Sequence, residues 1–249
     1  RQLGRVDEAR AEAEASLALD RLDYSAMIEQ RWLGGGDAYR ALFADDVHTY
    51  TEIALDYAHA GLYAEAIALL DEAPPADPMV RYYAGWLHLQ NGDLTAADER
   101  FAEAAQLPPD YCFPHHVEAV IALEAAIQRQ PDDARAPYYL GNFWYAHRRY
   151  AEAIECWERA RSLDPHFPTV YRNLGLAYMN KRGDAQAAKA AYEQAFVLDP
   201  SDSRILFELD QLDKQLGRAP SERLARLEQY APLVALRDDL TIERLTLLN

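Results

Sequence analysis

The feature that most constrains the fold is a unit of about 34 residues that occurs twice in a row between Arg135 and Pro200. Gly141 and Gly175 are 34 residues apart, and Pro165 and Pro200 are 35 apart. A repeat of this length predicts a supersecondary unit that buries its apolar face only when it is stacked against neighbours. The landmarks are Leu140, Gly141, Trp144, Ala153, Trp157, Ala160 and Pro165 in the first copy, and Leu174, Gly175, Tyr178, Ala188, Tyr192, Ala195 and Pro200 in the second.

The spacing within each copy predicts a pair of antiparallel helices. Leu140, Trp144, Trp157 and Leu163 recur at helical spacing and form one apolar face. Glycine in the first helix and alanine in the second have little bulk, so the two backbones can approach closely. The Asp-Pro pairs at 164–165 and 199–200 end the second helix, because proline disfavours helical backbone at the preceding residue.

These landmarks resemble the signature of the tetratricopeptide repeat, W-x2-L-G-x2-Y followed by A-x3-F and P. The resemblance implies an all-α fold, a right-handed superhelical array of antiparallel helix pairs. By the same pattern we expect irregular N-terminal helices with a partial repeat at 1–46 and an array at 47–249. Its units are 47–77, 78–109, a partial unit at 110–133, 134–167, 168–202, 203–231, and a partial unit at 232–249.

Two parts of this array depart from the pattern. Asp210 takes the place that glycine has in the other first helices. Pro232–Asn249 is predicted to form one helix whose apolar face, with Leu236, Leu240, Ile242, Leu245, Leu247 and Leu248, has no following partner. We therefore expect the chain to self-associate through this end.

Composition limits the classes of partner. The formal net charge of −16 argues against nucleic acid and anionic membranes as main partners. Two cysteines, Cys112 and Cys156, do not suggest a disulfide framework, and no apolar run is long enough to span a membrane. The sequence does not begin with methionine, so we interpret it as a piece of a longer protein and expect it to lie in the cytoplasm.

No catalytic constellation emerges from the sequence, and we expect neither enzyme activity nor a cofactor. The run Gly34-Gly35-Gly36 lacks the Lys-Ser/Thr of a phosphate loop. Where the period breaks, Tyr111, His115 and His116 form a candidate site in an irregular segment that replaces a first helix. The alternative is that the segment is a tolerated deletion of a helix. Cys112 with the two histidines falls short of the four ligands of a typical zinc site, so no metal is predicted.

A binding groove is the more plausible site, because first helices line the concave surface of tetratricopeptide arrays. Aromatic, amide and guanidinium side chains there suit an extended peptide or a sugar. The alternative is that most of the 16 tyrosines pack between helices. The candidate residues are Tyr82, Trp86, Arg135, Tyr138, Asn142, Tyr145 and Arg172.

The co-chaperone members of the family hold a C-terminal carboxylate with Lys, Asn and Arg on successive first helices. By this resemblance Asn142 and Arg172 match, whereas Tyr138 stands where the lysine is needed. That departure argues against a chaperone tail as the ligand.

A second resemblance is narrower. The runs 110–115, 133–142 and 180–184 are similar to the C-terminal helical array of large bacterial proteins. In those proteins a sandwich domain related to carbohydrate-active folds precedes the repeats. Our main hypothesis is a non-catalytic scaffold that binds a peptide or partner domain in its groove. The alternative is an accessory half of a carbohydrate-active protein that packs on a separate catalytic domain.

Overall fold

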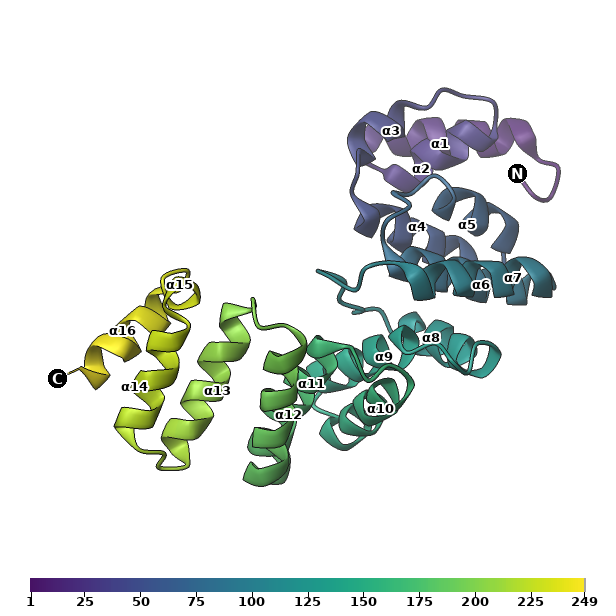
Figure 1. Ribbon diagram of the computed structural model, residues 1–249. Coiled ribbons are helices and arrows are strands. Elements are labelled where there is room, and N and C mark those ends of the chain that lie inside the picture. The colour runs from purple at the N-terminus through teal and green to yellow at the C-terminus, as the bar shows by residue number, and fades with distance from the viewer. Residues whose placement is uncertain (249) are drawn as a thin grey trace. The chain divides into compact units, whose positions relative to one another are not determined.

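The computed structural model describes residues 1–248, apart from the side chain of Ala38. Within that range the chain forms helices joined by short segments, without a β-strand (Figure 1). It divides into two compact units, Arg1–Cys112 and Phe113–Asn249. The predicted fold class, an all-α array of helix pairs, is confirmed.

The first unit groups the N-terminal helices with two regular helix pairs. α1 packs against α2, α4 against α5, and α6 against α7. The bounds are α1 Val6–Leu19, α2 Tyr24–Trp32, α3 Ala38–Phe43, α4 Val47–His59, α5 Tyr63–Leu70, α6 Pro78–Gln90 and α7 Leu94–Gln106.

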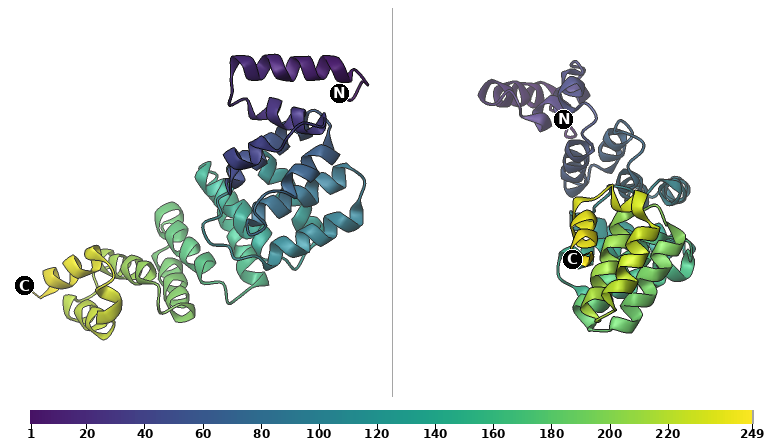
Figure 2. Two further views of the ribbon diagram at one scale, coloured as in Figure 1. Left: turned by 90° about the horizontal axis from the view of Figure 1, so that it is seen from above. Right: turned by 60° about the vertical axis from the view of Figure 1, so that its left-hand side comes forward.

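The second unit begins with α8, which packs against α9, and continues with three pairs, α9/α10, α11/α12 and α13/α14. Figure 2 shows α12, α13 and α14 side by side, in green and yellow. The bounds are α8 Glu118–Arg129, α9 Arg135–Ala146, α10 Tyr150–Leu163, α11 Pro168–Ala177, the π-helical turn η1 Tyr178–Arg182, α12 Ala185–Leu198, α13 Ser203–Gln215, α14 Pro220–Gln229, α15 Ala231–Val234 and α16 Asp238–Leu247.

Glycine in three of the first helices lies directly against an aromatic ring of the second helix. A Cβ atom on Gly141 would come within 2.5 Å of the Trp157 ring, and one on Gly175 within 2.8 Å of the Tyr192 ring. Gly85 has the same relation to Phe101, at 2.5 Å. Because these distances are well below van der Waals contact, only glycine fits, which explains the Gly-aromatic landmarks of the repeat.

The π-helical turn absorbs one extra residue in the second of the two strong repeats. Gly141 and Trp157 are 16 residues apart, whereas Gly175 and Tyr192 are 17 apart. Both rings nevertheless cover their glycines. The additional residue is accommodated in the wider turn at 178–182, as π-bulges typically allow.

A buried ion pair replaces the glycine contact in the pair α13/α14. Asp210 and Arg223 have exposed fractions of 0% and 4%, and the Arg223 Nη2 donates to Asp210 Oδ2 at 2.6 Å. Next to them Asp213 accepts from Lys189 at 2.7 Å and from Arg218 at 3.0 Å, and pairs with Arg226 at 2.6 Å. Burial opposes ionisation of Asp213, but these three cations outweigh it and hold the pKa of the carboxyl below its usual value.

The turn between the two helices of a pair requires left-handed backbone. Gly61, Gly92, Gly183 and Gly217 take this position, with φ of 76°, 83°, 66° and 73°. In the pair α9/α10 the same position holds Arg148, with φ 63°. A side chain there costs roughly 1–2 kcal/mol relative to right-handed backbone.

The C-terminal stretch is not the single helix that the sequence predicted. α15 ends at Val234 and α16 begins at Asp238, with extended backbone at Arg237 between them. The face of α16 that packs on α14 buries Leu240 completely. Of the other apolar side chains, Leu247 is half-buried, and Leu236, Ile242, Leu245 and Leu248 are 73%, 64%, 53% and 51% exposed.

Candidate binding face of the second unit

An amide ladder joins the first helices α9 and α11. The Asn142 Oδ1 accepts hydrogen bonds from Trp157 Nε1 at 3.1 Å and from Asn173 Nδ2 at 3.2 Å. The same indole nitrogen also donates to the Tyr138 carbonyl at 3.3 Å. The acceptor of Asn142 is therefore used within the fold, and its Nδ2 is the group left to contact a ligand.

Arg172 holds a carboxylate with two hydrogen bonds, as the sequence suggested, but the carboxylate belongs to the chain. Its Nε donates to Glu208 Oε2 at 2.8 Å, and its Nη2 donates to the other oxygen. Arg204 Nε reaches the same carboxylate at 3.2 Å. To bind Arg172, a ligand carboxylate would have to displace the carboxylate of Glu208, a residue of α13.

Three of the predicted groove aromatics are buried, so the expectation that they are free to contact a ligand is wrong. Tyr82 is 0% exposed, Trp86 9% and Tyr138 5%. The ring of Tyr138 lies 4.7 Å from that of Phe167, which precedes α11. First helices pack against both their own partner and the neighbouring repeat. More of their circumference is therefore buried than pairing alone predicts.

Arg135 and Tyr145 are half-buried on α9. The guanidinium of Arg135 lies 4.0 Å above the Phe167 ring. Tyr145 contacts the rings of Tyr150 and Trp157, at 5.1 Å and 5.3 Å between centroids. Burial raises the pKa of the Tyr145 hydroxyl, so it is neutral and able to donate a hydrogen bond at physiological pH.

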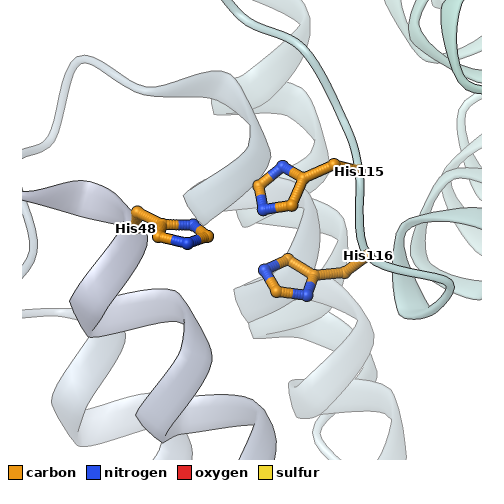
Figure 3. Close-up of side chains that lie close together, drawn as sticks. All are labelled: His48, His115 and His116. Carbon is orange, nitrogen blue, oxygen red and sulfur yellow. The ribbon is translucent and has the colours of Figure 1, made fainter. Parts of the chain in front are cut away.

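The irregular segment before α8 carries the other predicted site. Tyr111 is 95% exposed and has left-handed backbone, with φ 57°. The rings of His115 and His116 lie 4.1 Å apart, and His115 Nδ1 is 3.2 Å from the Phe113 carbonyl (Figure 3). Residues 107–117 contain no helix, and a binding role for this segment stays a prediction.

The sequence did not predict a pocket of about 140 Å³ between α11, η1 and α13. Its apolar walls are Leu176, Met179, Tyr192, Phe207 and Leu212, and its polar groups are Asn180, Glu208, Gln211 and Gln215. The Nε2 of Gln211 is buried and has no hydrogen-bond partner among residues 1–248. Phe207 and Gln211 are one helical turn apart, but only the structure shows which face of α13 meets α11.

Two larger hollows have less specific linings. One of about 420 Å³ in the first unit is lined mainly by small residues and carboxylates of α1, α2 and α4. Another of about 370 Å³, between α8, α9 and α10, includes Cys156. Burial raises the pKa of that thiol to about 11, so it is protonated near neutral pH and is a weak nucleophile.

Comparison with family models agrees with the repeat landmarks. A model described as TPR repeat matches residues 145–181, and one described as tetratricopeptide repeat matches residues 168–202. The two matches together cover residues 145–202. The matched region contains the whole of α11 and the π-helical turn, with the pocket residues Leu176, Met179 and Asn180.

Alignments with similar proteins cover more of the chain than the family models do. Tetratricopeptide repeat protein 37 of Xenopus laevis is 28% identical over 172 residues, which are 61% of this chain and 11% of that protein. BBSome complex member BBS4 of Bos taurus is 26% identical over 79% of this chain and 43% of its own length. The chain thus spans less than half of either relative.

Among solved structures, a protein of Thermus thermophilus that is described as a thermophilic TPR protein is 21% identical. The match covers 81% of this chain and 98% of that one, with a TM-score of 0.43. Within residues 1–248, the helices are all too short or too polar to cross a membrane.

Proposed function

We propose that the chain is a non-catalytic interaction scaffold, and that the face formed by α9, α11 and α13 binds an extended segment of a partner protein. The observation that carries this proposal is the pocket between α11 and α13, where apolar walls surround a buried amide donor without a partner among residues 1–248. Binding sites typically combine apolar walls with a few placed polar groups. The tetratricopeptide repeats at 145–202 support the proposal, because such arrays generally bind proteins or peptides.

The relatives are consistent with a scaffold. The name of BBS4 places that protein in a multiprotein complex. We extend only this general role to the present chain. A cytoplasmic location belongs to the same proposal.

The test is selection of ligands from a library of random peptides, followed by binding measurements with two variants. Leu176→Glu places a charge in the groove, whereas Val197→Glu places the same charge on an exposed site of α12, where Val197 is 72% exposed. We expect Leu176→Glu to weaken binding at least about tenfold, since a charge would be buried by the ligand. Val197→Glu should bind as the parent does.

Circular dichroism and thermal melting of both variants show whether the fold is kept. Equal binding by the two folded variants, or failure to select any peptide, would contradict the proposed groove.

A second candidate function is that of an accessory array that packs on another domain of a carbohydrate-active protein. The exposed side chains Leu236, Ile242, Leu245 and Leu248 favour it, because apolar area of this kind commonly marks an interface. The gene sequence upstream of residue 1 tests it: a sandwich domain there supports the accessory role, and its absence contradicts it. The same surface is also where self-association would occur.

A further inference from the structure

We infer that the pocket between α11 and α13 is a specificity pocket for one leucine or methionine side chain of an internal, extended peptide segment. This inference rests on the proposed function and adds the class of ligand. Three properties of the pocket carry it, namely its volume, its charge balance and its unmatched donor.

The volume sets the size of the side chain that fits. A cavity of about 150 Å³ lined by apolar side chains holds one benzene molecule. The present pocket, at about 140 Å³, is close to that size and therefore has room for one leucine or methionine side chain, with less room for the larger indole. Met179 in the wall is flexible and can adjust to either shape.

The charge balance excludes charged side chains from the pocket. Glu208 is its only ionisable carboxylate, and that group is already held by Arg172 and Arg204. A ligand lysine or arginine would have to replace these partners, and a ligand carboxylate would meet Glu208. With the Arg172–Glu208 pair intact, the wall is close to neutral and favours an apolar side chain.

The unmatched donor defines how the backbone of the segment binds. Gln211 Nε2 is buried and lacks an acceptor among residues 1–248. A buried donor without a partner carries a desolvation cost, which a peptide carbonyl next to the inserted side chain would remove once the Gln211 amide turns toward it. Because Arg172 is occupied, the site offers no free guanidinium for a C-terminal carboxylate. The geometry thus favours an internal segment.

The three methionines of the chain provide a direct probe. Met179 lines the pocket, whereas Met27 and Met79 belong to the first unit. Protein labelled with [methyl-13C]methionine is titrated with N-acetyl-L-leucine methylamide, and in parallel with the corresponding aspartate and tryptophan derivatives. We expect the Met179 signal alone to shift, saturably, and only with the leucine derivative. A shift of equal size with all three probes, or no shift at Met179, would overturn the inference.

Two amide variants separate the donor from general effects of mutation. Gln211→Ala should weaken leucine-probe binding about fivefold, the loss expected for one hydrogen bond. Gln186→Ala makes the same change at an exposed position of α12 and should bind as the parent does. Equal affinities for the two variants would contradict the role of Gln211.

A peptide library distinguishes this inference from the proposed function. If selected peptides bind the groove and lose binding with Leu176→Glu but show no preference for leucine or methionine, the scaffold function stands and the specificity pocket fails. If no peptide binds, both fail.

Discussion

The helix pairs α11/α12 and α13/α14 have the same role in the array but are held together in different ways. In the first, Gly175 lies under the Tyr192 ring. In the second, Asp210 occupies the glycine position and binds Arg223. The comparison shows that the architecture requires a close contact at this position, which either shape or charge can supply. The two contacts are sensitive to different substitutions. Added side-chain volume should destabilise the glycine contact, whereas loss of a charge should destabilise the ion pair.

The largest expected effect is that of Arg223→Met. The change removes both hydrogen bonds to Asp210 and the one to Glu243, and leaves the fully buried carboxylate of Asp210 with Arg226, whose Nη2 is 3.6 Å away. Breaking a buried pair by removing one partner costs about 3–5 kcal/mol. Hydrogen exchange of α13 and α14 should report this loss, and the double variant Asp210→Ala/Arg223→Met should regain most of it. Arg204→Met, whose side chain is 59% exposed, is the matched control and should cost less than about 0.5 kcal/mol.

The next effect is that of added volume in a glycine pair. Gly141→Leu places a side chain where even a Cβ would lie 2.5 Å from the Trp157 ring. Ala153→Leu overfills the same interface, because Ala153 is 0% exposed. Overpacking typically costs about 1–3 kcal/mol, and thermal melting should fall for both variants. Unchanged melting would show that the interface is not the close contact described here.

Low pH should destabilise the helix pair that is held by buried ion pairs more than the pairs that are held by glycine contacts. Burial opposes ionisation of Glu243, but Lys214 and Arg223 outweigh it and lower its pKa, as Lys189, Arg226 and Arg218 do for Asp213. A carboxyl with a lowered pKa stabilises the fold above its unfolded pKa of about 4, and this contribution is lost as pH falls through the folded value. Hydrogen exchange at pH 7 and pH 3 should therefore show a larger loss of protection in α13–α16 than in α9 and α10. Equal losses would contradict a charge-dependent interface.

The smallest effect concerns the turns of two pairs. Arg148→Gly relieves left-handed backbone at a position where α11/α12 has Gly183, and should stabilise the second unit by about 0.5–1 kcal/mol after the entropy of the unfolded glycine is counted. Gly183→Arg should destabilise it by a similar amount. Urea denaturation of the two variants measures both changes, and shifts of the same sign would refute the explanation.

The sequence predicted the helix pairs because their landmarks are local and periodic. Gly141, Ala153 and Trp157 have counterparts at nearly the same spacing in the next repeat, so one copy supports the other. The C-terminal helix was predicted wrongly because leucines at helical spacing continue through the break at Arg237. In the structure the shorter helix α16 packs on α14 and α15, and Leu240 is fully buried.

The candidate site was less predictable, since its properties depend on contacts between repeats. The position of Asp210 was recognised, but its partner Arg223 was not, although it stands four residues after the N-cap of α14, where α10 and α12 have the landmark residues Ala153 and Ala188. Arg172 was expected to hold a carboxylate, and the structure supplies that carboxylate from α13. Tyr138 was expected in the groove, yet packing against adjacent helices buries it. Gln211 could not be predicted from the sequence, because whether an amide donor has a hydrogen-bond partner depends on the packing around it.

The single extra residue in η1 bears on how such a pocket changes in evolution. The extra residue is taken up within the wider turn at 178–182, so this turn helps to set the direction of Met179 and Asn180, which lie in it and line the pocket. Deleting one codon within 178–182 would restore the 16-residue spacing of the preceding repeat and redirect these side chains. Deletion of Lys181 or Arg182, neither of which lines the pocket, would thus alter the pocket while all of its lining residues are kept.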